Sequence, residues 1–167
     1  MTRWTARLGA HVPVVAFDYP YRLAGRGRPD PTAVLEEAHI AAIDSAARVG
    51  RVGLLGHSMG GRIGIHVATP ERVVGAVALS YPLFGSGDPN RSRAPALVAG
   101  SVPTLFVAGD RDPLAPLDAL QAALATRPAP WTLHVVAGGD HSLKVRKAEQ
   151  AAADDGVLAA ILAFFGI

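Results

Sequence analysis

The sequence contains no cysteine, which excludes disulfide bonds, thiolate metal sites and a cysteine nucleophile. Charged residues make up only 18% of the 167 residues, and aromatic residues only 6%. The 16 basic and 14 acidic residues nearly cancel, leaving a net charge of +2. The few basic clusters are not interleaved with aromatic residues, so nothing favours a nucleic-acid partner.

Long apolar runs are also missing. No stretch of about 18 apolar residues could span a membrane, and no apolar region of a signal peptide follows the first positive charges. Half of the residues are nevertheless hydrophobic, as in a globular protein. We therefore expect one domain over residues 1–167, in the cytoplasm and without a membrane partner. The sequence does not indicate an oligomeric state.

Segments typical of strands and of helices alternate along the chain. This alternation predicts an α/β fold, with a mostly parallel sheet and helices on both faces. The predicted strands are residues 12–17, 52–55, 73–79, 102–109 and 131–136, and the predicted helices are residues 31–49, 61–68, 114–126 and 155–165. Asp30 precedes the first of these helices as an expected N-cap. The irregular stretch 82–101 is either a cover over the site or a solvated connection.

The most informative stretch is Gly56-His57-Ser58-Met59-Gly60, which has the pattern G-x-S-x-G. It lies between a predicted buried strand and a predicted helix, the context of a nucleophile elbow. In an elbow the sharp turn exposes the serine, and the glycines keep side chains away from the turn. Ser58 is therefore the predicted nucleophile, and the amide of Met59 at the helix N-terminus is the predicted oxyanion donor.

A nucleophilic serine needs a base, which the chain order of an elbow places after the serine. Two histidines qualify. His134 lies inside a predicted strand, whereas His141 lies in a glycine loop just after that strand. Catalytic groups of open α/β sheets collect at the C-terminal ends of the strands. The sequence therefore favours His141 as the base and His134 as a structural residue.

The acid that orients the base is expected at the end of the preceding strand. Asp110 and Asp112 both follow the predicted strand 102–109. Pro113 keeps Asp112 extended and away from a helix, which favours Asp112. Asp110 remains the alternative, although it could simply cap the turn or pair with Arg111.

Other polar and aromatic residues near the predicted strand ends are weaker candidates. Tyr19 and Tyr81 follow strand ends and, with His57, are possible pocket residues. The basic residues just past His141 (Lys144, Arg146 and Lys147) could attract an acidic substrate, but a solvated turn is the simpler interpretation. The histidines show neither i, i+4 pairs nor ligand spacing, so we expect no metal and no cofactor.

The motifs that contain these candidate residues make the chain similar to members of the α/β-hydrolase superfamily. Within it, the chain is similar to the dienelactone-hydrolase-related branch of testis-expressed protein 30 and the NSL complex subunit 3. The matching stretches are residues 17–21, 25–30, 56–62, 80–83, 109–113 and 138–144. The resemblance implies that Ser58 is the nucleophile, Asp112 the acid and His141 the base. Dienelactone hydrolases proper use a cysteine nucleophile, which this chain lacks.

The beginning of the chain departs from the pattern of this superfamily. Residues 1–9 resemble the tail of the helix that follows a central strand and its His-Gly-rich loop. We therefore expect a fold that lacks its N-terminal strands, including the strand that would lie between the segments 12–17 and 52–55. The lost loop would have carried the second oxyanion donor.

Two functions compete on these grounds. The first is a serine hydrolase that cleaves an ester, thioester or lactone of a small molecule. The second is a catalytically weak or inactive α/β-hydrolase-like module used for binding or as a scaffold, which the missing oxyanion loop favours. A nucleotide-binding role for the glycines of residues 56–61 is disfavoured, because the G-x-G-x-x-G spacing and the lysine of a P-loop are absent.

Overall fold

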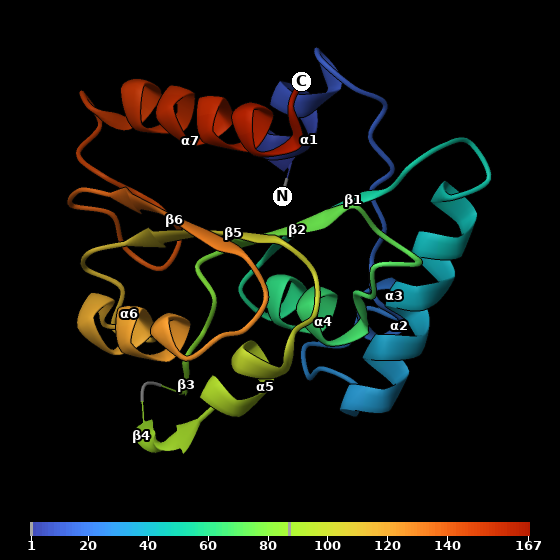
Figure 1. The fold of residues 1–167 in the computed structure, drawn as a ribbon, viewed down its shortest axis with the longest axis horizontal. Helices are drawn as coiled ribbons and strands as arrows, with labels where there is room; N and C mark the ends of the chain where they lie inside the picture. Colours follow the sequence, from blue (N-terminus) through green and yellow to red (C-terminus); the bar gives the residue numbers. More distant parts are fainter. Residues whose placement is uncertain (1, 87) are drawn as a thin grey trace.

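The computed structural model describes residues 2–86 and 88–167, and it has three layers (Figure 1). The middle layer is a sheet of four strands in the order β1-β2-β5-β6. These strands are β1 (Gly53–His57), β2 (Gly75–Leu79), β5 (Thr104–Gly109) and β6 (Trp131–Val136). Neighbouring strands are parallel throughout, so all four end at the same edge of the sheet. The predicted α/β fold with a parallel sheet is confirmed.

The two central strands explain why the sequence is so apolar there. Every residue of β2 and of β5 is buried, because helices cover both faces of the sheet. β1 and β6 form the two edges and are partly exposed. The register places Gly56 beside Ala78 and His57 beside Leu79. The strand that leads to the predicted nucleophile is therefore an edge strand in the described part of the chain.

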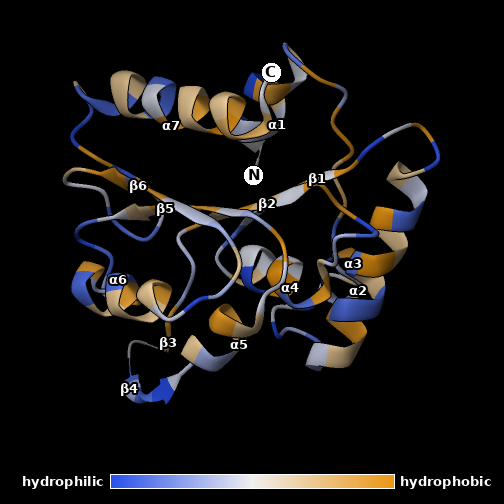
Figure 2. Ribbon diagram, viewed as in Figure 1, coloured by the Kyte–Doolittle hydropathy of each residue, from blue (hydrophilic) through white to orange (hydrophobic). Residues whose placement is uncertain are grey.

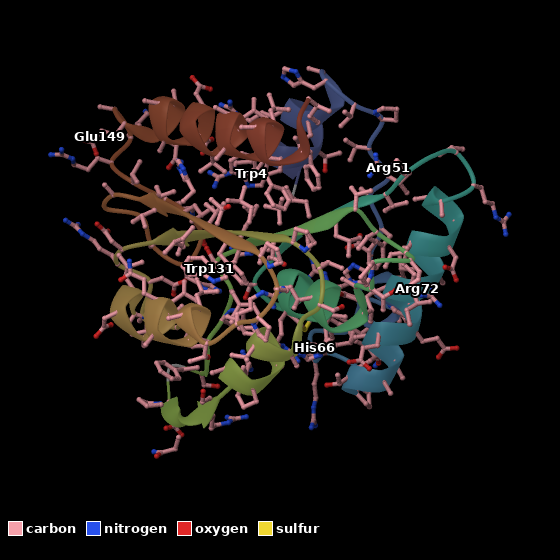
Figure 3. The ribbon with its side chains drawn as sticks, in the orientation of Figure 1. Trp4, Arg51, His66, Arg72, Trp131 and Glu149 are labelled. Atoms are coloured by element: carbon pink, nitrogen blue, oxygen red, sulfur yellow. The ribbon has the colours of Figure 1, made fainter. Side chains whose placement is uncertain are left out.

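Two helices cover one face of the sheet, and these are α1 (Thr2–Gly9) and α7 (Gln150–Phe165) (Figure 1). Their core includes Trp4 with Val77 and Leu105 from the sheet. Figure 3 shows Trp4 between these helices and the strands, and its side chain is only 3% exposed. The other face carries α2 (Pro20–Leu23), α3 (Thr32–Ala46), α4 (Met59–Val67), α5 (Ala94–Ala99) and α6 (Leu117–Ala125).

The irregular stretch 82–101 forms a small antiparallel hairpin followed by α5. The hairpin consists of β3 (Phe84–Gly85) and β4 (Asp88–Ser92). β4 is the most strongly hydrophilic strand in Figure 2, and most of its residues are exposed. In the part of the chain that is described, no helix has both the length and the apolar character needed to cross a membrane.

The prediction of a strand over residues 12–17 is wrong. Residues 13–19 have no regular secondary structure, and they connect α1 on one face of the sheet with α2 on the other (Figure 1). No described residue hydrogen-bonds to the main chain of residues 13–18, and Val15 is 60% exposed. An apolar sequence does not make a strand where no neighbouring strand offers its hydrogen-bonding edge.

Two helix starts also differ from the predictions. Pro31, and not Asp30, is the N-cap of α3, because the Asp30 carboxylate instead pairs with the Arg26 guanidinium at 2.7 Å. α7 begins at Gln150, earlier than the predicted residue 155. The first residue of the helix, Gln150, therefore lies close in sequence to the loop that carries the predicted base, His141.

Candidate active site

Ser58 lies at the sharp turn between β1 and α4, as the pentapeptide predicts. Its φ of 52° and ψ of −116° fall in a region that residues other than glycine rarely occupy. Two main-chain hydrogen bonds hold the turn: Ser58 N–H donates to Leu79 O at 2.8 Å, and Arg62 N–H donates to Ser58 O at 3.0 Å. The strained turn therefore places the serine at the C-terminal edge of the sheet, in a fixed orientation.

Close packing at the turn requires glycine at two positions. A Cβ atom on Gly56 would lie 2.4 Å from the carbonyl carbon of Gly60, and one on Gly61 would lie 2.7 Å from the carbonyl oxygen of Gly56. A Cβ atom on Gly60, in contrast, would meet no heavy atom within 4 Å. Gly56 and Gly61 thus allow the helix to approach the strand, while Gly60 leaves space beside Ser58.

The structure brings together the three side chains predicted for the catalytic site. The Oγ of Ser58 lies 2.8 Å from Nε2 of His141, and Nδ1 of His141 lies 2.7 Å from Oδ2 of Asp112. The Asp112 carboxylate accepts hydrogen bonds, so the proton of a neutral His141 is on Nδ1. Nε2 is then free to accept the proton of the Ser58 hydroxyl.

The two aspartates have different partners. The side chain of Asp112 is fully buried, and its second oxygen accepts a hydrogen bond from Leu114 N–H at 2.8 Å. Asp110 is exposed, and its carboxylate accepts a hydrogen bond from Gly138 N–H at 2.8 Å. Asp112 thus contacts the imidazole of His141, whereas Asp110 binds the main chain of the loop that carries His141.

His134 lies away from Ser58. It is half-buried on β6 and faces α7, where a Cβ atom on Gly156 would lie 3.9 Å from its ring. Burial lowers the pKa of His134, as expected for a neutral imidazole packed between a strand and a helix.

Met59 is the first residue of α4, directly after Ser58. The main-chain amides at the start of a helix have no partner within the helix and point outward from its positive end. The amide of Met59 is therefore placed to donate a hydrogen bond to a negative oxygen that forms next to Ser58. The Met59 side chain packs against the cluster of Tyr19, Tyr21, Leu35 and Ile63.

The predicted pocket residues have structural partners. Tyr81 is buried and donates its hydroxyl hydrogen to Arg93 O at 3.1 Å, while the Tyr19 hydroxyl lies 3.1 Å from Nδ1 of His39. Burial raises the pKa of each tyrosine to about 12, so both stay protonated at neutral pH. His57 Nε2 donates to His141 O at 2.8 Å, and burial lowers the His57 pKa. Of these three residues, only His57 contacts a residue of the predicted triad through these hydrogen bonds.

The loop after β6 contains contacts that the sequence does not reveal. The Asp140 carboxylate accepts hydrogen bonds from Ser142 N–H at 2.7 Å and Lys144 N–H at 2.9 Å. These amide donors, that of Lys144 foremost, lower the pKa of Asp140. Arg3 Nη2 also donates to Ser142 O at 3.0 Å, across a separation of 139 positions. No local pattern in the sequence could indicate such a distant contact.

The charged residues past His141 point to the solvent. Lys144, Arg146 and Lys147 are exposed, and Arg146 is paired with Glu149. Figure 3 shows Glu149 at the outer end of α7. Among residues 2–86 and 88–167, no group of three or more histidine, aspartate or glutamate side chains is arranged to hold a metal ion.

Several solved structures share this fold. An alpha-beta serine hydrolase homologue from Coxiella burnetii aligns with 82% of this chain and 62% of its own, with a TM-score of 0.62 and 21% identity. Est1E from Butyrivibrio proteoclasticus aligns over 83% and 72%, with a TM-score of 0.62 and 18% identity. Dienelactone hydrolase from Anabaena variabilis aligns over 74% and 56%, with a TM-score of 0.56 and 23% identity.

The chain thus spans about three fifths of the length of the Coxiella protein. No curated protein sequence matches it significantly. A family model described as an alpha/beta hydrolase domain matches residues 1–165, nearly the whole chain. Together with the parallel sheet and the serine at the turn after β1, this match shows that the chain belongs to the alpha/beta hydrolase domain family.

Proposed function

We propose that the chain is a serine hydrolase that cleaves an ester, thioester or lactone of a small molecule. The observation that carries this proposal is the continuous contact from Ser58 through His141 to the buried Asp112 carboxylate. Nucleophilic catalysis by serine requires a base within hydrogen-bond reach and a group that orients this base. Structural residues have no need for such an alignment at a strained turn.

The reaction follows from the protonation states in the site. Ser58 Oγ attacks the substrate carbonyl carbon while His141 Nε2 takes the hydroxyl proton, and Asp112 stabilises the imidazolium that forms. The Met59 amide donates to the oxyanion of the tetrahedral intermediate. His141 then gives its proton to the leaving group. A water molecule next attacks the acyl-enzyme while His141 takes its proton, and His141 returns this proton to Ser58 Oγ as the acid product leaves. The scheme needs no metal or cofactor.

The comparisons support the general class of this activity. Proteins with this fold include a serine hydrolase homologue and a dienelactone hydrolase. We also propose that the chain falls in the dienelactone-hydrolase-related branch, near testis-expressed protein 30 and the NSL complex subunit 3. The motifs at residues 56–62 and 138–144 support this placement.

A fluorophosphonate probe tests the proposal directly, because it forms a covalent bond only with an activated serine. We expect labelling of the wild-type protein on Ser58 and none of the Ser58→Ala variant. Ser45→Ala, at an exposed position on α3, is the matched control and should label like wild type. If a folded wild-type protein takes up no label and hydrolyses no ester, the inactive scaffold becomes the better interpretation.

A further inference from the structure

The loop that carries His141 is held by an unusual set of contacts. Three successive main-chain carbonyl oxygens each accept a hydrogen bond from a side chain of a different element. His141 O accepts from His57 on β1 at 2.8 Å, and Ser142 O accepts from Arg3 on α1 at 3.0 Å. Leu143 O accepts from Gln150 on α7 at 3.1 Å. The carbonyls of the loop are therefore fixed from three directions.

The amides and one side chain of the same loop are also fixed. Oε1 of Gln150 accepts a hydrogen bond from Val145 N–H at 3.1 Å, so this side chain holds the loop at two points. Leu143 is only 1% exposed, although its φ of 56° is unfavourable for leucine. A loop with such a residue keeps its shape only where surrounding contacts determine it.

The side chains that hold the loop are themselves tied together. Asp154 on α7 is only 7% exposed, and its carboxylate lies 3.3 Å from Arg3 Nη1. The same carboxylate accepts a hydrogen bond from Gln150 Nε2 at 2.9 Å. The Arg3 guanidinium also lies over the ring of Trp4, 5.1 Å from its centroid. Asp154 thus orients both donors toward the loop.

We propose that Arg3, Gln150, Asp154 and His57 form a base-loop clamp that positions His141 for proton transfer. They are positioning residues, since none of them touches the reacting atoms. General-base catalysis tolerates little displacement, and a shift of about 1 Å can cost about 10²-fold in rate. The inference rests on the proposed function, because it assigns the clamp to the base of that reaction.

Arg3→Ala and Arg7→Ala form a matched pair of test variants. The two side chains lie one turn apart on α1, with 34% and 31% exposure, and both pair with Asp154. Among the described residues, Arg7 pairs with Asp155 at 2.7 Å and with Asp154, and not with the loop. We expect Arg3→Ala to lower kcat by about tenfold or more with little change in KM. Arg7→Ala should keep the wild-type kcat at a similar melting temperature.

Two conservative variants sharpen the test. Arg3→Lys keeps a donor that can reach Ser142 O, so it should recover part of the kcat that Arg3→Ala loses. Gln150→Glu keeps the acceptor for Val145 but removes the donor to Leu143, and it places a second carboxylate beside Asp154. We expect Gln150→Glu to lower kcat, with the loss shrinking at acidic pH, where the new carboxylate is protonated.

Amide hydrogen exchange of residues 140–145 separates this inference from the proposed function. Faster exchange there in Arg3→Ala but not in Arg7→Ala, together with a lower kcat, supports the clamp. Equal exchange in the two variants overturns it, and so does faster exchange with an unchanged kcat. If the wild-type protein hydrolyses nothing, the proposed function fails and exchange alone decides whether the loop is clamped.

Discussion

Two segments without regular secondary structure differ sharply in how the protein holds them. In the loop of residues 137–145, side chains from β1, α1 and α7 bind successive main-chain groups, and Leu143 is buried in the core. The segment of residues 13–19 has no main-chain hydrogen bond from any described residue over 13–18. Its apolar side chains at Val14, Val15 and Phe17 are 38%, 60% and 40% exposed.

The difference shows that the absence of a helix or strand does not mean the absence of order. The order of a segment depends on how many of its polar groups are paired and how much of its apolar surface is buried. The loop with the candidate base satisfies both conditions. The segment 13–19 is anchored mainly at its end, where Phe17 and Tyr19 pack against His39.

The largest effect is expected at the loop. His141→Ala should lower ester hydrolysis by about 10²- to 10⁴-fold, because it removes the base for proton transfer. His134→Ala, on the strand that leads into the loop, should keep most of the activity, since its ring faces α7. Steady-state kinetics of both folded variants checks this. A more severe loss for His134→Ala would reverse the two assignments.

Asp110 and Asp112, which both contact this loop, give a second contrast. Asp112→Asn should lower kcat by about 10²-fold or more, since an amide can stabilise neither the imidazolium nor the required tautomer. Asp110→Asn should have a much smaller effect, because its oxygen can still accept from Gly138 N–H. Comparing kcat of the two variants tests the assignment, and equal losses would leave the acid unidentified.

The anchor of the segment 13–19 should depend on pH through the buried side chain of His39. Burial lowers the pKa of His39 from 6.5 to about 4 in the folded protein. Between these values the unfolded chain binds the proton and the folded protein does not, so stability falls as the pH drops from 6.5 toward 4. The full difference corresponds to about 3 kcal/mol.

The variant His39→Gln isolates this effect, because glutamine does not titrate. Urea unfolding at several pH values should show a smaller acid loss of stability in the variant than in wild type, with no difference in slope above pH 6.5. The proposal about His39 fails if wild type and variant lose stability in parallel.

The sequence predicts most of the sheet and the triad candidates, for physical reasons that differ between regions. The buried strands β2 and β5 are continuous apolar runs, and the turn at Ser58 has a local glycine pattern. Contacts such as Arg3 with Ser142 depend on the packing of distant helices and leave no local pattern. The segment 12–17 misleads, because its valines suit a strand, but none of the strands in the described part of the chain pairs with it.

The smallest effect is expected in the segment 13–19, where Val15→Ala should change the free energy of unfolding by no more than about 0.5 kcal/mol. The matched variant Leu143→Ala removes a buried side chain from the base loop and should cost about 2–5 kcal/mol. Urea unfolding at neutral pH measures both. Similar losses in the two variants would mean that Val15 is buried in solution, and that the two segments do not differ as their contacts indicate. A small loss for Leu143→Ala would mean that burial of this side chain contributes little to the order of the loop. Hydrogen bonds alone would then hold the positive φ of residue 143.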